Sequence, residues 1–366
     1  MARGHNRAGH RGIRADGPGG KRGERREISR RYFLGLAIGA PAAAALLAAC
    51  GGDDGEGGGR ERVRVQLDWT PNTNHIGIYV GLAKGWYEEQ GLDVQVLPYT
   101  DANPDTIVAN GNAEVGISFP ANVIFSRAAG LDLISVAAVL QSNPTELAVL
   151  ESSDIKRPRD FDGRTYAGFG LPYEEPQIRT VIKADGGKGE FETAVLSTAA
   201  YEALYEKRAD FTEIFTTWEG IEAGLRGIKL RTFRYDAFGV PDFPGVVLVA
   251  RRSAVNETSP LRRFLEVTRR GYELAAAGPD EASQVFMDHL PGAFPEPELV
   301  RRSTRMLASF FVDKAGRWGT QDASKWQAYS RWFLGQGIVK DRNDKVIDNE
   351  SALGGPLFTN ELLPGG

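Results

Sequence analysis

The sequence predicts an α/β protein made of two units, each with a mainly parallel sheet flanked by helices. Strand-like and helix-like segments alternate from Arg62 onward, which is typical of parallel strands joined by helices. A body of roughly 300 residues is long enough for two domains of about 150 residues. The content of 42% hydrophobic and 10% aromatic residues provides a sizeable core and excludes collagen, coiled coil and general disorder.

The first predicted unit reaches to about Glu151. Its strands alternate in polarity or are apolar throughout, and its helices are bounded by residues that suit helix ends. Gly85 suits a left-handed cap after the first helix, and Asn103-Pro104 supplies an N-cap and a first-turn proline for the second. The predicted strands are 63–67, 91–97, 115–118, 133–140 and 147–150. The predicted helices are 76–84, 103–111 and 120–130.

Charge and Pro158 interrupt the pattern between 151 and 159, so we place a boundary there. The second unit has predicted strands at 164–168, 211–215 and 229–233, and predicted helices at 175–184 and 199–207; a further predicted strand follows at 246–250. The last third is mostly helical, because 260–277 carries apolar residues at helical spacing. An aromatic stripe near the end predicts core packing. Its members are Trp326, Tyr329, Trp332 and Phe333.

Charge and residue content exclude several kinds of function. The formal net charge is −4, but residues 1–49 carry +7 and the remaining 317 carry −11. So acidic a body is unsuited to nucleic acid, whose phosphates are bound by lysine and arginine. The single cysteine, Cys50, excludes intrachain disulfides and thiolate metal sites, and we expect no metal. The sequence contains no GxSxG, HExxH or Walker A motif, so we expect no catalytic residues and no cofactor.

Residues 1–49 are predicted to be an export signal. Arg30 and Arg31 precede Phe-Leu and resemble a twin-arginine export signal, with the general secretory route as the alternative. The apolar run that follows is short and contains Pro41, which favours a signal over a membrane span.

Cys50 follows Leu47-Ala48-Ala49 and resembles the acylated cysteine of a lipobox, which would become the mature N-terminus. Residues 50–61 are polar and rich in glycine, as a flexible tether between a lipid and a folded body must be. We therefore expect an extracytoplasmic protein that is anchored to the cell membrane by lipid.

The segment LDWTPNTNHIGIYV, residues 67–80, carries the strongest likeness to a known family. Together with later matches it resembles the solute-binding proteins for thiamine-pyrimidine precursors, which are bacterial relatives of the fungal thiamine-pyrimidine synthases. Related proteins take up riboflavin, sulfonates or nitrate. The later matches lie at 85–87, 91–94, 114–118, 218–223 and 235–242.

This resemblance implies a two-lobed periplasmic-binding-protein fold of type II. The lobes of such proteins close on a small-molecule ligand and report loading to the permease and ATPase of an ABC importer. The resemblance assigns 62–151 and 244–366, including the C-terminal helices, to the first lobe and 152–243 to the second. We expect a monomer.

Four ligand-binding residues are predicted in the opening motif. Trp69 follows a strand, at the sheet edge where α/β proteins bind ligands, and its indole can stack on a flat ring; the alternative is a core tryptophan. The amides of Asn72 and Asn74 offer donors and acceptors to a ligand, but they also suit a turn or a helix cap. His75 is a candidate from its place in the motif, although a single histidine is more often structural.

Two further candidates on the first lobe are Ser118 and Asn122. Ser118 ends a strand just before the Pro120 helix, where free backbone N–H groups favour an acceptor atom. Asn122 lies in the first turn of that helix.

On the second lobe, the first three candidates are Gly168, Gly170 and Glu174. The two glycines belong to a turn that brings backbone close to the ligand, and their spacing lacks the third glycine of a dinucleotide fingerprint. Glu174 is equally well explained as a first-turn acid that interacts with the helix dipole.

The strongest candidate of the second lobe is Glu219, beside Trp218 at a predicted helix start; the resemblance places it in the cleft. A carboxylate next to an aromatic ring suits an amidine-like edge, such as that of a 4-aminopyrimidine, whereas the alternative is an ordinary N-terminal helix acid. Tyr235 and Asp242 are weaker candidates near the return to the first lobe.

These residues predict binding of a thiamine-pyrimidine precursor, of the formylaminopyrimidine or hydroxymethylpyrimidine type. The alternatives are another solute (riboflavin, a sulfonate or nitrate) or an extracytoplasmic enzyme acting on aminopyrimidine-like substrates. The fungal synthases use a cysteine-rich motif that this body lacks, which argues against enzymatic activity.

Overall fold

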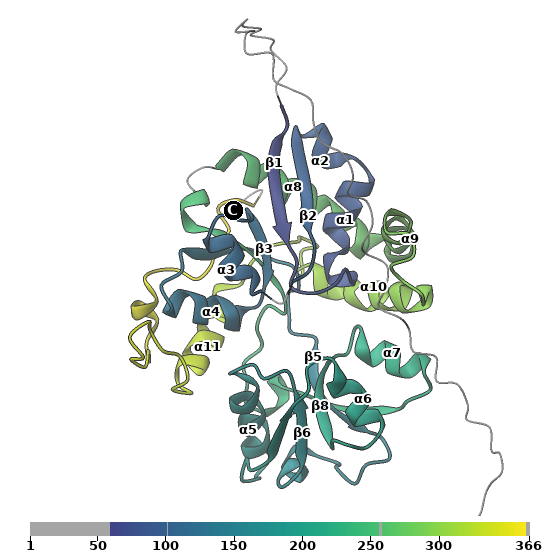
Figure 1. The fold of residues 1–366 in the computed structure, drawn as a ribbon, viewed down its shortest axis with the longest axis vertical. Coiled ribbons are helices and arrows are strands. Elements are labelled where there is room, and N and C mark those ends of the chain that lie inside the picture. Colours follow the sequence, from purple (N-terminus) through teal and green to yellow (C-terminus); the bar gives the residue numbers. More distant parts are fainter. Residues whose placement is uncertain (1–58, 101, 256–257, 364–366) are drawn as a thin grey trace, which may run out of the picture. The chain divides into compact units, whose positions relative to one another are not determined.

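The computed structural model describes residues 59–100, 102–255 and 258–363, and these form two five-stranded sheets flanked by helices (Figure 1). The first sheet has the strand order β2-β1-β3-β10-β4. Its strands are β1 (Glu61–Gln66), β2 (Leu92–Leu97), β3 (Val115–Ser118), β4 (Leu133–Ala138) and β10 (Val247–Arg251). The predicted export motif at Arg30 and Arg31 and the predicted lipidation site at Cys50 lie outside the described residues.

The helices of the first lobe begin and end where local sequence favours it. The Asn103 side chain accepts a hydrogen bond from the N–H of Asp105 (2.9 Å) and caps α3, and Gly85 has the left-handed φ of +70° expected of a cap. The helices are α1 (Ile76–Ala83), α2 (Trp86–Glu89), α3 (Pro104–Ala109), α4 (Pro120–Ala128), α8 (Thr258–Ala277), α9 (Pro279–His289), α10 (Pro297–Phe311) and α11 (Ala323–Leu334).

Helix α1 is apolar and buried, and it crosses α8 at a pair of glycines. A Cβ added to Gly271 would lie 2.0 Å from the carbonyl oxygen of Gly77, so neither helix could approach the other with a larger residue at Gly271. None of the described helices combines the length and the apolar composition that crossing a membrane requires.

The second sheet has the strand order β7-β6-β8-β5-β9. Its core packs Phe161 against Phe211 and Phe211 against Tyr166, with ring centroids 4.2 and 5.2 Å apart. The strands are β5 (Thr145–Leu150), β6 (Thr165–Gly168), β7 (Glu192–Val195), β8 (Phe211–Phe215) and β9 (Leu230–Arg234). The helices are α5 (Glu174–Ala184), α6 (Ala199–Tyr205) and α7 (Glu219–Leu225).

In each sheet four strands run in one direction and a single strand opposes them, so both sheets are mixed, and the predicted two-lobed α/β fold is confirmed. The opposing strands are β10 in the first sheet and β5 in the second. Each is the strand by which the chain enters that sheet directly from the other sheet.

The strand pairing moves one predicted boundary. Strand β5 pairs with β8 and β9, so 145–150 belongs to the second sheet and not to the first lobe. The chain leaves the first sheet through 139–144, the outgoing passage, and comes back through 235–246, the return passage. The charged interruption at 151–159 is the loop after β5.

Two elements were not predicted, and one prediction about the core is confirmed. Strand β7 is a mostly exposed edge strand without an apolar pattern, and α2 is a single turn. The aromatic stripe of α11 is core, since Trp326, Tyr329 and Phe333 are buried.

Candidate functional site

An aromatic pair, the exposed Trp69 and the half-buried Tyr99, lies at the carboxyl edge of the first sheet. Trp69 follows β1 and is 36% exposed, and its ring centroid lies 5.3 Å from that of Tyr99, which follows the neighbouring parallel strand β2. Ligands of open α/β sheets bind at this edge. The indole is therefore accessible and not a core residue.

The turn after Trp69 is held by its own side chains. The Asn72 Oδ1 accepts from the N–H of Asn74 (2.9 Å), and its Nδ2 donates to the carbonyl of Thr70 (3.1 Å). These bonds use one donor and one acceptor of the Asn72 amide for capping, as the alternative reading expects, and its ligand contact stays a prediction.

His75 is fully buried and both ring nitrogens are engaged. Its Nδ1 accepts from the N–H of Asn72 (3.3 Å), and its Nε2 lies 2.8 Å from Oδ1 of Asp68. No nitrogen is left for a ligand, so the predicted direct contact is corrected to a role inside the turn. Sequence reasoning missed Asp68, although it stands beside Trp69.

The remaining first-lobe candidates differ in accessibility. Ser118 is buried, and its hydroxyl lies near Asp105 but outside hydrogen-bond geometry. Burial raises the pKa of Asp105, and the nearby hydroxyls of Ser118 and Ser126 partly offset that rise. Ser118 thus faces α3 and not an open surface, which corrects its predicted ligand contact. The side chains of Asn74 and Asn122 are half-buried and make no hydrogen bond to any part of the described chain, so both stay candidates.

Glu174 fills a pocket of backbone donors at the start of α5. Its carboxylate accepts from the N–H groups of Phe169, Gly170 and Leu171 (2.9, 2.9 and 3.0 Å) and from the hydroxyl of Tyr166 (3.1 Å). Both oxygens are saturated and the side chain is buried. Glu174 therefore organises the loop, and its predicted ligand contact is corrected.

The two glycines serve the same loop. A Cβ at Gly168 would lie 2.4 Å from the ring of Tyr166, and Gly170 has a φ of +82°. Both positions need glycine for conformation and packing. Gly168 and Gly170 therefore shape the loop, and a contact of its backbone with ligand stays a prediction.

Glu219 and Trp218 lie where the second sheet meets the first lobe. Phe215 and Trp218 pack against the core of the first sheet, and the ring of Phe215 lies 6.4 Å from that of Phe119. Glu219 begins α7, as predicted, and its Oε2 accepts from the N–H of Phe215 (3.0 Å). Burial raises the pKa of Glu219 to about 7.

A second carboxyl, Glu213 on β8, was missed. It accepts a hydrogen bond from the hydroxyl of Tyr235, and burial raises its pKa to about 7, with the neighbouring charges of Glu174 and Glu219 adding to the rise. Tyr235 is buried and its hydroxyl donates to Glu213, so it supports this carboxyl, and its ligand contact stays a prediction. A polar residue in an alternating strand gives no sequence signal of such surroundings.

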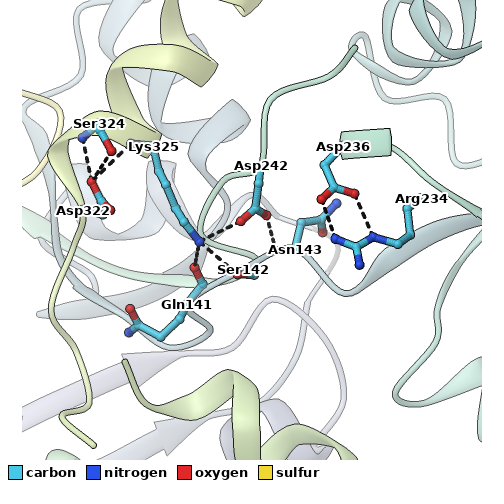
Figure 2. Close-up of polar contacts among 9 residues, drawn as sticks. All are labelled: Gln141, Ser142, Asn143, Arg234, Asp236, Asp242, Asp322, Ser324 and Lys325. Carbon is cyan, nitrogen blue, oxygen red and sulfur yellow. Dashed lines mark hydrogen bonds and ion pairs between the residues drawn. The ribbon is translucent and has the colours of Figure 1, made fainter. Parts of the chain in front are cut away.

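Asp242 belongs to the return passage and lines a small pocket there together with Tyr235 and Arg234, and its ligand contact stays a prediction. Figure 2 shows Lys325 reaching from α11 to Asp242 (2.7 Å), to the carbonyl of Gln141 (2.7 Å) and to the hydroxyl of Ser142 (2.9 Å). The other Asp242 oxygen accepts from the N–H of Asn143 (3.2 Å). Both oxygens are used.

The chain forms two α/β lobes that are joined by two passages, and aromatic and carboxyl groups lie where the lobes meet. This arrangement is that of a two-lobed solute-binding protein. Residues 72–282 match the family described as NMT1/THI5 like, and the chain belongs to that family. It is 30% identical over 283 residues to the formylaminopyrimidine-binding protein of Halalkalibacterium halodurans, a match that covers 75% of this chain and 84% of that protein.

More distant relatives share the fold. The 4-amino-5-hydroxymethyl-2-methylpyrimidine phosphate synthase THI5 of Saccharomyces cerevisiae is 23% identical over 246 residues, covering 63% of this chain and 72% of that protein. The periplasmic aliphatic sulphonate binding protein SsuA from Escherichia coli matches with a TM-score of 0.59 and 17% identity, covering 79% of this chain and 95% of that chain. The structural match establishes the common fold.

Proposed function

We propose that this protein is the extracytoplasmic solute-binding component of an ABC importer and captures a pyrimidine precursor of thiamine, of the formylaminopyrimidine or hydroxymethylpyrimidine type. One observation carries the proposal: an exposed indole, Trp69, lies on one lobe, and a half-buried carboxyl, Glu219, lies on the other where the second sheet meets the first lobe. The 30% identical relative that bears the name formylaminopyrimidine-binding protein supports the choice of ligand.

The two side chains recognise different features of such a ligand. Trp69 stacks on the face of the pyrimidine ring. Glu219 pairs with its amidine-like edge. With a pKa of about 7, the carboxyl can donate its proton to a ring nitrogen while accepting from the exocyclic amine, or it can bind the protonated ring as a carboxylate.

The charges of the candidate site favour an aminopyrimidine ligand over a small anion. The titratable side chains that raise the pKa of Glu213 are two other carboxyls, and Tyr235 is its hydrogen-bond partner. Nitrate or a sulfonate would bring a further negative charge next to these groups and would need arginine or lysine instead. Riboflavin has a flat ring without this charge conflict, so it is the alternative solute that the experiment must include.

We place the protein outside the cytoplasmic membrane as a monomer, exported by its N-terminal signal with Arg30 and Arg31 and held by lipid on Cys50. The fungal synthases use a cysteine-rich motif, whereas the sequence after Cys50 contains no cysteine, which supports binding without turnover. Replacing Cys50 with Ser should release the protein from the membrane fraction. An unchanged membrane fraction would contradict lipid anchoring.

Isothermal titration of the compact body, starting at Arg60, tests the ligand. We expect one molecule of formylaminopyrimidine or hydroxymethylpyrimidine to bind per chain and to be recovered unreacted, while thiamine, riboflavin and taurine do not bind. Glu219→Ala should weaken binding about 10- to 100-fold, as expected for loss of a charge-assisted hydrogen bond. Glu206→Gln, at an exposed ion pair with Arg208, is the matched control. Wild-type affinity in Glu219→Ala would exclude the assigned role, and product formation would favour an enzyme.

A further inference from the structure

The turn after β1 holds a carboxylate that the proposed function does not use. Asp68 immediately precedes Trp69, and its side chain keeps 13% of its surface exposed. Oδ1 lies 2.8 Å from Nε2 of His75. Oδ2 makes no hydrogen bond to the rest of the described chain.

The direction of the hydrogen bond between His75 and Asp68 follows from the surroundings of the ring. The backbone N–H of Asn72 points at Nδ1 (3.3 Å), so Nδ1 is the acceptor and the ring proton of the neutral imidazole resides on Nε2. Nε2 therefore donates to Asp68. The oxygen of Asp68 that receives this bond is held inside, which leaves the other oxygen as the outward acceptor.

Two distant helices hold this turn rigid. The hydroxyl of Tyr272 on α8 donates to the carbonyl of Asn74 (2.6 Å), and the hydroxyls of Thr73 and Ser303 on α10 share a hydrogen bond (2.5 Å). Tyr272 is itself buried and stacked on Trp318, with ring centroids 4.9 Å apart. The position of the Asp68 carboxylate is therefore determined before any ligand arrives, which is what a binding group requires.

Asp68 differs from two other candidate carboxylates, Glu174 and Asp242, in the number of its oxygens that already accept hydrogen bonds. Glu174 has both oxygens saturated by backbone and tyrosine donors, and Asp242 has both engaged by Lys325 and Asn143. Asp68 has one oxygen engaged and the other without a hydrogen bond among the described residues, and it directly precedes the exposed Trp69 at the ligand-binding edge of the sheet. A preoriented acceptor in that place suits an N–H donor on a ring that lies against the indole.

We propose that Asp68 is a ligand-binding residue of the first lobe, that its outward oxygen accepts an N–H of the ring stacked on Trp69, and that His75 is a positioning residue that acts through Asp68. This inference rests on the proposed function and deepens it. Two carboxyl groups then hydrogen-bond to the ligand, Asp68 from one lobe and Glu219 from the other. The site therefore selects an uncharged or protonated aminopyrimidine and rejects its phosphate ester.

Titration of the full-length chain with formylaminopyrimidine and hydroxymethylpyrimidine tests this inference. Asp68→Ala should bind the preferred pyrimidine about 10- to 100-fold more weakly. Asp68→Asn retains an oxygen for the bond from His75 and presents an N–H₂ group to the ligand, so it should show a similar loss while keeping the wild-type melting temperature. This second variant keeps the test valid if Asp68→Ala fails to fold.

The role of His75 is tested by a double-mutant cycle. His75→Phe should lose about as much affinity as Asp68→Ala, and the double variant should lose no more than either, because both remove one interaction. His75→Gln, which retains an N–H donor, should recover part of the affinity. A purely structural role of His75 would instead give additive losses and no recovery.

The outcomes separate this inference from the function on which it rests. If Glu219→Ala weakens binding while Asp68→Ala and Asp68→Asn bind like the wild type, Asp68 is not a ligand contact and the proposed function stands. If the phosphate ester binds as tightly as the free pyrimidine, the claimed selectivity is wrong. If the wild-type chain binds neither pyrimidine, both proposals fall.

Discussion

Lys325 of α11 joins the two passages between the sheets through Asp242, with Nζ and Oδ2 2.7 Å apart. The same ammonium group donates to Gln141 and Ser142 in the outgoing passage, so its three donors are all used. The passages also touch directly, since a Cβ at Gly245 would lie 2.7 Å from the carbonyl oxygen of Ser142. One lysine thus ties together the two connections about which the lobes would close.

Replacing Lys325 with Met should destabilise the protein by about 1–3 kcal/mol. The variant keeps the aliphatic stem but removes all three donors, and it leaves a partly buried Asp242 without its cation. The free energy of unfolding in urea checks this. Lys314→Met, at an exposed position, is the control and should change stability by less than about 0.5 kcal/mol. Equal stability of the two variants would show that the ion pair is dispensable.

Glu174→Gln should destabilise the protein by about 3 kcal/mol, because the new amide nitrogen faces N–H donors that it cannot satisfy. Glu175→Gln is the control, because it makes the same substitution at the next residue in the first turn of α5. Glu175 is about half exposed and pairs with Arg179, so its loss should be below about 1 kcal/mol. Urea unfolding of both variants measures the difference, and a Glu174→Gln loss as small as that of Glu175→Gln would contradict the structural role.

The two carboxyls with a pKa of about 7, Glu213 and Glu219, predict a loss of stability as the pH rises. Each binds its proton more tightly in the folded chain than in the unfolded chain, where the usual pKa is about 4.3. Their contribution is complete below about pH 4 and is lost as the pH rises through about 7. The difference of about 2.7 pKa units corresponds to a loss of at most about 4 kcal/mol for each carboxyl.

Glu213→Gln isolates this contribution. Other carboxyls act in the opposite sense, such as Asp185, whose pKa Arg157 lowers to about 2, so only the difference between variant and wild type is diagnostic. We expect the free energy of unfolding of the wild type to fall more than that of Glu213→Gln between about pH 5 and about pH 8. Parallel pH curves would show that Glu213 titrates normally.

Much of the fold was predictable from sequence because its signals are local. The helix start at Asn103-Pro104, the cap at Gly85 and the helix beginning at Glu219 depend on residues within a turn of one another. The family resemblance of 67–80 and 218–223 pointed to Trp69 and Glu219, the two residues on which the proposed function depends.

The sequence by itself determined the alternation of strands and helices, the acidic body and the family, since periodicity, capping and motif are properties of neighbouring residues. Only the tertiary structure decided that β5 belongs to the second sheet, that Glu174 is saturated and that His75 turns inward to Asp68. It alone paired Asp242 with Lys325, 83 residues away. A side chain's function depends on which of its donors and acceptors the fold has already satisfied, and those partners are contributed by distant segments.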